Sequence, residues 1–233
     1  MKKWFVVILG VWLILSSLAV TFLVQKNPVE SAGIKMAWGL ILLWVIFLGS
    51  LMYKFRDSVK QFVQKIPLQW QVKFILFATL LILIEEAITT GMTNLAPLLG
   101  VKMGQAYITA SANYWDVIFF HSVISIAPMF IAWAVFLYFY DFSPFEVFLL
   151  FGISGVIAEG TFSGSWALFA LWVFVYGLMV YLPTYCIPSE RKTKKPKWWF
   201  YPLTIILPFL FIPLLAWLPK LVDPNHPKID FIK

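Results

Sequence analysis

Two adjacent carboxylic residues, Glu85 and Glu86, lie in the middle of an apolar stretch that runs from Phe74 to Asn94. A charged side chain at the centre of a bilayer costs about 2.5–3.5 kcal/mol on insertion scales. A helix with a purely structural role has no reason to carry that cost twice. The pair is therefore the strongest indication of chemistry in the chain, whether acid–base catalysis, proton transfer or metal ligation.

Two more ionisable residues lie within apolar stretches, His121 and Glu159. At about 1.5 Å of rise per helical residue, Glu85 and Glu86 come near the midplane of their span. By the same measure all four side chains can converge in the outer half of the membrane. Glu85, Glu86, His121 and Glu159 are the candidate catalytic residues.

Smaller polar residues extend this set. Those expected to support the site are Thr89, Thr90, Thr93, Asn94, Ser125 and Ser163. The first four share one helical face with Glu86, at spacings of three and four residues, and form a polar stripe that leads outward. Ser125 shares a face with His121.

Two features indicate how the site is assembled. Gly152 and Gly155 share a face with Glu159, and small residues allow helices to approach closely. The segment Gly100–Asn113 is expected to cover the site from outside, with Asp116 near its mouth.

The composition defines the fold class. The 233 residues are 61% hydrophobic and only 12% charged, whereas soluble domains carry about 25% charged residues. Continuous apolar runs disfavour a β-barrel, whose strands alternate. We expect an all-α, polytopic transmembrane helix bundle that forms a single integral membrane domain over residues 1–233, with the site helices at about 74–165. The single cysteine, Cys186, excludes an internal disulfide and any multi-cysteine metal site.

Apolar windows of about 18 or more residues predict about seven spans. They are Trp4–Val24, Met36–Tyr53, Phe74–Asn94, Tyr114–Tyr140, Phe145–Phe162, Trp166–Tyr185 and Phe200–Leu218. The first is expected to be an uncleaved signal anchor. Pro128 should kink the fourth span, and several prolines should bend or partly unwind the last one. A tight hairpin is expected at Ser163-Gly-Ser165.

The distribution of basic residues predicts the orientation. A cytoplasmic N-terminus and an external C-terminus place 12 of the 18 lysines and arginines on the cytoplasmic side. These are Lys2, Lys3, Lys54, Arg56, Lys60, Lys65, Lys73, Arg191, Lys192, Lys194, Lys195 and Lys197. A multi-pass protein of the cell membrane is the expected localisation.

The same assignment bears on partners. The basic run Arg191–Lys197 is better explained as a topology determinant that meets anionic lipid headgroups than as a nucleic-acid patch. The amphipathic segment Lys54–Gln71 is expected to lie along the inner membrane surface. The lipid bilayer is therefore the expected partner, and no nucleic acid is expected.

The motif spacing resembles a known family. Glu-Glu on one span and histidine on the next resembles the CAAX-protease and bacteriocin-processing (CPBP) family of intramembrane glutamate proteases. Its motifs are Glu-Glu-x-x-x-Arg, Phe-x-x-x-His and His-x-x-x-Asn on successive spans. Glu85, Glu86 and His121 match. Thr90 stands in place of the arginine and Val117 in place of the phenylalanine, while Glu159 and Ser163 stand in place of the last histidine and asparagine.

This resemblance implies a metal-independent hydrolase without a cofactor. One glutamate of the pair would act as general base on a water molecule, and His121 would position or polarise the scissile carbonyl. The implied substrate is a membrane-embedded or lipidated peptide. With three of the seven motif positions matched, an inactive relative of such enzymes fits the pattern as well.

Other classes remain open. Titratable residues near the midplane and a proline-containing span are also typical of a proton-coupled transporter of small solutes. A metal site could use Glu85 or Glu86 with His121 and Glu159, although no Glu-x-x-His spacing favours it. A structural or partner-binding membrane protein is the fourth possibility.

Overall fold

A computed structural model describes residues 2–163 and 166–226, and this part of the chain is helical, with no strand. The first half contains α1 (Lys2–Val24), α2 (Pro28–Leu40), the π-helix η1 (Ile41–Leu48), α3 (Gly49–Lys65), α4 (Trp70–Asn94) and the 3-10 helix η2 (Ala96–Leu99). The second half contains α5 (Tyr114–Phe120), α6 (Ser122–Phe139), α7 (Pro144–Ser163), η3 (Trp166–Leu168), α8 (Phe169–Tyr185), α9 (Phe200–Ile206), η4 (Leu207–Leu215) and α10 (Leu218–Val222). The all-α prediction is confirmed.

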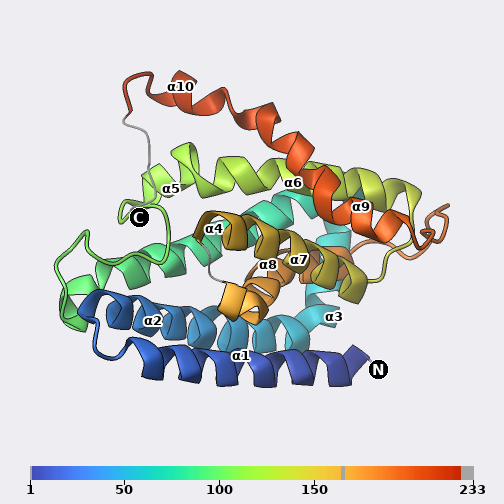
Figure 1. Ribbon diagram of the computed structural model, residues 1–233. Helices are drawn as coiled ribbons and strands as arrows, with labels where there is room; N and C mark the ends of the chain where they lie inside the picture. Colours follow the sequence, from blue (N-terminus) through green and yellow to red (C-terminus); the bar gives the residue numbers. More distant parts are fainter. Residues whose placement is uncertain (1, 164–165, 227–233) are drawn as a thin grey trace.

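Five helical segments of the described chain are long and apolar enough to cross a membrane. They are Lys3–Val24, Pro28–Lys65, Ser122–Phe139, Trp166–Tyr185 and Phe200–Val222. The other two expected spans correspond to α4, with 25 residues, and α7, with 20 residues, which lie inside the bundle (Figure 1). Seven membrane crossings therefore remain a prediction, whereas a multi-helix membrane protein agrees with the structure.

The second expected span and the amphipathic segment after it form one continuous helical stretch, Pro28–Lys65. Within this stretch the backbone changes to a π-helix at η1, a feature that commonly bends helices. Figure 1 shows α3 turning away from the line of α2 and crossing the end of the bundle. This direction suits a segment that lies along a membrane surface.

The fourth expected span is interrupted, but not where the sequence indicates. α6 continues through Pro128, and the break lies at His121, which separates α5 from α6. The interruption thus lies seven residues before Pro128, and the expected kink at Pro128 stays a prediction. In the last span, by contrast, Pro208 and Pro213 lie in the 3-10 helix η4, so this span departs from α-helical geometry at its prolines but winds more tightly instead of unwinding.

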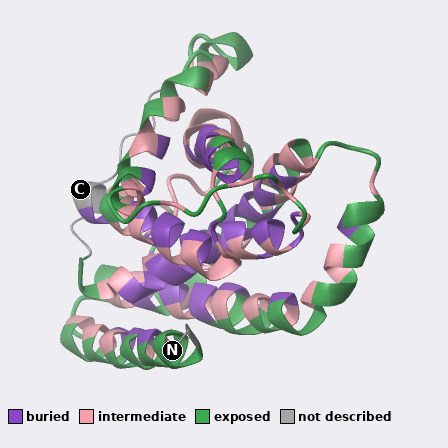
Figure 2. Ribbon diagram, turned by 90° about the vertical axis from the view of Figure 1, so that its right-hand side faces the viewer, coloured by how far each residue is buried: buried purple, intermediate pink, exposed green. Residues whose placement is uncertain are grey.

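The core lies between α4, α6, α7 and α8, and the outer helices expose apolar side chains (Figure 2). Trp44, Trp133 and Phe151 are fully buried. The Trp44 indole Nε1 donates a hydrogen bond of 3.1 Å to the Val175 carbonyl, which ties η1 to α8. Exposed apolar residues on α1 and on α9–α10 are suited to lipid contact.

The contact between α7 and α8 depends on glycines, as the sequence predicts. A Cβ atom on Gly152 would lie 2.6 Å from the Val173 carbonyl oxygen, and one on Gly155 would lie 2.3 Å from the Tyr176 ring. Both distances are shorter than the normal separation of two non-bonded heavy atoms. Residues 164 and 165, where most of the hairpin is expected, lie outside the described residues.

Gly152→Ala should therefore destabilise the protein by about 1–3 kcal/mol, because overpacking forces the two helix backbones apart. Gly33→Ala is the matched control, since Gly33 also lies within a helix but a Cβ atom added there would have no neighbouring atom within 4 Å. That change should be neutral or stabilising by up to about 1 kcal/mol. Thermal unfolding in detergent measures both, and equal effects would contradict the packing argument.

The two ends of the bundle are formed by different segments of the chain. The start of α1, α3 and the segment 186–199 lie at one end, whereas the segment 95–113 and the end of α10 lie at the other (Figure 1).

Cys186 is buried at the first end, and burial raises the pKa of its thiol to about 11. At pH 7.5 this thiol is almost entirely protonated and reacts slowly.

Single cysteines introduced into a Cys186→Ser background should report the predicted orientation. Lys102→Cys, at the second end, should react with a membrane-impermeant maleimide in intact cells. Lys195→Cys, at the first end, should react only after permeabilisation. The reverse pattern would show that the predicted N-in orientation is wrong, and reaction of both in intact cells would contradict a membrane-spanning bundle.

Candidate functional site

The centre of the site is the carboxyl group of Glu86, which α4 holds in the protein interior. Glu85 and Glu86 are 4% and 5% exposed. The Thr89 hydroxyl, one turn along α4, lies 3.0 Å from Glu86 Oε2, and the Thr109 hydroxyl donates to the same oxygen at 2.9 Å. The Ser122 side chain, at the start of α6, lies beside this carboxyl group. Three hydroxyl groups from three separate segments therefore meet at Glu86.

The polar stripe on α4 faces the covering segment. The Thr93 hydroxyl accepts a 3.3 Å hydrogen bond from the Ile108 amide, and the Asn94 amide donates to the Ala112 carbonyl at 2.8 Å. Together with Thr109, these contacts place the segment 100–113 over the site, as the sequence predicts. Thr90, where the family motif has arginine, is buried, and its hydroxyl has no partner among the described residues. The stripe thus keeps one unused hydrogen-bonding group one turn from Glu86.

His121 joins the site at the interruption between α5 and α6. Its Nδ1 lies 2.9 Å from the Ser122 hydroxyl, and its carbonyl accepts a hydrogen bond of 2.9 Å from Ser125. Ser125 therefore supports the backbone at the break rather than the ring. Ser122 links the imidazole to the Glu86 carboxyl group. A continuous helix would have turned Ser122 about 100° away from His121, so this link was missed in the sequence.

Glu159 enters the same region from α7. The Tyr176 hydroxyl on α8 donates a 2.7 Å hydrogen bond to Glu159 Oε1. The carboxyl groups of Glu85, Glu86 and Glu159 are close enough for their charges to interact. The glycine contact that brings α8 against α7 also brings Tyr176 to Glu159. The side chain of Ser163 lies outside the described residues.

Two site residues beyond Ser122 were not expected. Thr109 lies in a segment without helical periodicity, so its sequence carries no signal for the direction of its side chain. Tyr176 lies within a uniformly apolar span, where an aromatic residue is ordinary. The tight Gly155 contact could have indicated that α8 approaches Glu159, but not which residue of α8.

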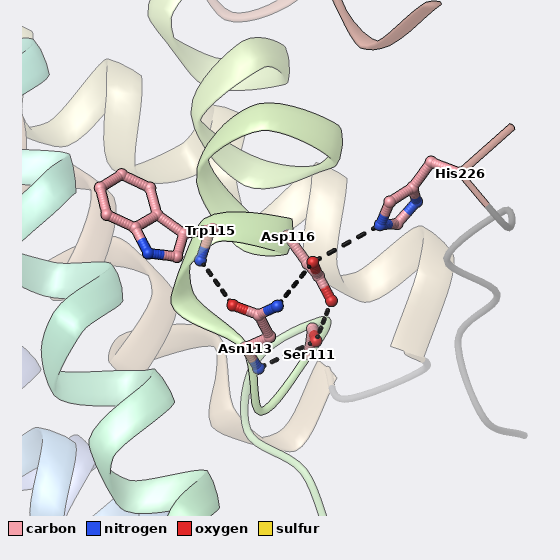
Figure 3. Close-up of polar contacts among 5 residues, drawn as sticks. All are labelled: Ser111, Asn113, Trp115, Asp116 and His226. Carbon is pink, nitrogen blue, oxygen red and sulfur yellow. Dashed lines mark hydrogen bonds and ion pairs between the residues drawn. The ribbon is translucent and has the colours of Figure 1, made fainter. Parts of the chain in front are cut away.

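Asp116 belongs to a separate cluster at the edge of the covering segment (Figure 3). Its carboxyl oxygens accept hydrogen bonds from Ser111 and Asn113, each at 2.9 Å, and the His226 Nε2 lies 3.5 Å away. Asn113 also caps α5 by accepting from the Trp115 amide at 3.0 Å. The cluster holds the end of the segment 100–113 against α5 and the C-terminal part of the chain. Asp116 therefore anchors the cover and does not line the site.

Within residues 2–163 and 166–226, no three His, Cys, Asp or Glu side chains are arranged to hold a metal ion. The described site is instead a set of carboxyl groups hydrogen-bonded by hydroxyl groups, with one imidazole beside them. Such a set can transfer protons or activate water.

Comparison with protein families, with curated protein sequences and with solved structures found no match. The resemblance to the CPBP family therefore stays a prediction that depends on Glu85, Glu86 and His121 alone.

Tyr176→Phe should test the contact between α8 and Glu159. The change keeps the ring that packs on Gly155 and removes only the hydroxyl donor. A hydrogen bond contributes about 0.5–1.5 kcal/mol, so Tm should fall by about 1–6 °C for a chain of this length. Tyr138→Phe, which removes an exposed hydroxyl, is the matched control and should leave Tm unchanged. Equal Tm values for the two variants would contradict a stabilising Tyr176–Glu159 hydrogen bond.

Proposed function

We propose that this protein is a membrane-embedded hydrolase of the intramembrane glutamate protease type, acting on a membrane-embedded or lipidated peptide. The observation that carries the proposal is the position of Ser122, whose hydroxyl lies 2.9 Å from the His121 Nδ1 and whose side chain lies beside the Glu86 carboxyl group. A general base and an N–H donor must both reach the same peptide bond to act on it. Glu86, rather than Glu85, is the carboxyl group that Ser122 brings next to His121.

In the proposed reaction, Glu86 accepts a proton from water as the water oxygen bonds to the scissile carbonyl carbon. An N–H of His121 stabilises the oxyanion that develops on the carbonyl oxygen. The carbon–nitrogen bond then breaks, and Glu86 returns the proton to the leaving amine. Glu159, held by Tyr176, occupies the position of the second family histidine and orients the other groups.

The surroundings of the site support this substrate class. The site lies among apolar helices and beneath the segment 100–113, so an apolar or lipidated peptide is better suited to it than a soluble one. The contact between Thr109 and Glu86 must open for a substrate to reach the carboxyl group. General acid–base catalysis contributes about 10²–10⁴-fold to rates, which sets the expected effect of removing the base.

Purified protein should cleave helical or prenylated peptides, and Glu86→Gln and His121→Ala should each lower the rate by about 100-fold or more. Glu30→Gln is the matched control, because Glu30 is an exposed carboxyl at the start of α2. Mass spectrometry of the products identifies the bond that is cleaved. Absence of cleavage across a panel of both peptide types, with folded protein, would contradict the proposal.

A second candidate is proton-coupled transport of a small solute. It is favoured by the interrupted helix at His121 together with the buried carboxyl groups of Glu85 and Glu86, a combination typical of transporter sites. Solute uptake into proteoliposomes that depends on a pH gradient and is lost in both Glu85→Gln and Glu86→Gln would favour this function. Cleavage without uptake would favour the hydrolase.

A further inference from the structure

A second hollow lies at the opposite end of the bundle from the covering segment. It has a volume of about 600 Å³ and lies between the start of α4, the end of α6 and the segment that follows α8. The lining residues are Trp70, Tyr138, Phe139, Tyr140, Arg191, Lys192 and Lys194. Three cationic and four aromatic side chains thus surround a space large enough for a phospholipid headgroup.

The backbone around this hollow is fixed by pairing between two distant segments. The Lys194 amide donates to the Phe139 carbonyl at 3.0 Å, and the Asp141 amide donates to the Lys194 carbonyl at 2.9 Å. This short bridge holds the basic segment against the end of α6. The positions of Lys192 and Lys194 therefore follow from the fold and not from a free chain.

Arg191 provides a fixed positive charge. Its guanidinium group lies 3.7 Å from Asp141, hydrogen-bonds the carbonyl groups of Leu137 and Pro188, and lies 5.2 Å from the Trp70 ring. Burial lowers its pKa from the ordinary value, but an arginine remains charged. Arg191 is thus already engaged with protein groups.

Lys192 and Lys194 differ from Arg191 in this respect. Both are exposed, and neither forms an ion pair with any residue in the described part of the chain. Asp141 is the acidic side chain that pairs with Arg191, and no acidic side chain of the described residues lines the hollow, which therefore carries a positive excess. Its chemistry indicates an anion.

The aromatic side identifies the kind of anion. Tyr138 and Phe139 are 55% and 56% exposed beside the cations. Aromatic rings beside basic residues at the end of a span are typical of the membrane–water interface, where headgroups and acyl chains meet. A soluble anion would use only the cations, whereas a phospholipid uses both parts of the hollow.

We propose that this hollow binds one acidic phospholipid, with its phosphate between Lys192 and Lys194 and its glycerol and upper acyl chains against Tyr138 and Phe139. The site is independent of the proposed hydrolase, because it shares no residue with the Glu86 region. Basic residues are attracted to an anionic leaflet in general, but at this site they bind one lipid molecule in a defined position.

Native mass spectrometry of the full chain, titrated with phosphatidylglycerol or phosphatidylcholine, tests the proposal. Phosphatidylglycerol should bind with a stoichiometry of one and about 10-fold or more tighter than phosphatidylcholine. The double variant Lys192→Gln/Lys194→Gln should weaken phosphatidylglycerol binding by about 30-fold, from the usual contribution of two lysines near an anionic surface.

The matched control is Lys195→Gln/Lys197→Gln, which removes the same charge from the same segment without touching the hollow. It should change the affinity by less than about 3-fold, since only distant and screened charge is lost. Equal weakening by both pairs would overturn the proposal in favour of diffuse attraction. Tyr138→Ala, which keeps every charge, should also weaken binding, and this variant decides the matter if the double variant fails to fold.

A competition arm distinguishes the source of the anion. Glycerol 1-phosphate and inorganic phosphate carry the charge without acyl chains, so at millimolar concentration they should not displace phosphatidylglycerol. Displacement by either would overturn the lipid assignment and indicate a site for a soluble phosphorylated molecule.

Discussion

The hydrogen bonds to the Glu86 carboxyl group constrain most of the interior. A buried carboxyl group without hydrogen-bond partners is costly. The donors come from α4, from the covering segment and from the start of α6. Burying this one group therefore requires that the segment 100–113 fold inward and that α6 begin where it does.

The interruption at His121 follows from this requirement. In an unbroken helix, His121 and Ser122 would point about 100° apart, and only one of them could face Glu86. With the break between α5 and α6, the Ser122 hydroxyl contacts both the ring and the carboxyl group. The local loss of helical hydrogen bonds is offset by polar contacts inside the site, and Ser125 binds the carbonyl group of His121 at the break.

A second constraint comes from the glycine face of α7. Because Gly152 and Gly155 lack side chains, the backbone of α8 approaches closely enough to place the Tyr176 hydroxyl on Glu159. Any larger residue at these positions would separate the two helices, and with them the two halves of the site. Packing and polar chemistry are therefore set by the same contact.

Sequence reasoning succeeded within regular helices, where the helical period determines the direction in which each side chain points. It located the helical segments, the polar stripe on α4 and the glycine face of α7, whereas the convergence of Glu159 with Glu85 and Glu86 stays a prediction. It failed at His121, where tertiary hydrogen bonds override a continuous apolar run, and it missed Thr109, whose direction no period determines. The continuity of Pro28–Lys65 was missed for a related reason, because the change from apolar to amphipathic composition coincides with no break in the backbone.

Two of the four substituted motif positions of the resembled family, Thr90 and Glu159, can be understood together. An arginine at position 90 would place a permanent cation one turn from Glu86, whereas Thr90 offers only a neutral hydroxyl. A histidine at position 159 would add a donor, whereas Glu159 adds a carboxyl group that takes its donor from Tyr176. The first change removes a permanent positive charge from the interior, the second removes a nitrogen donor, and hydroxyl groups take over the role of donors. A site built in this way depends on hydrogen bonds rather than on ion pairs, and these bonds require the covering segment and α8 to remain closed against α4 and α7. Opening the cover to admit a substrate removes the Thr109 donor from Glu86 at the same time, so access and the basicity of this carboxylate are coupled.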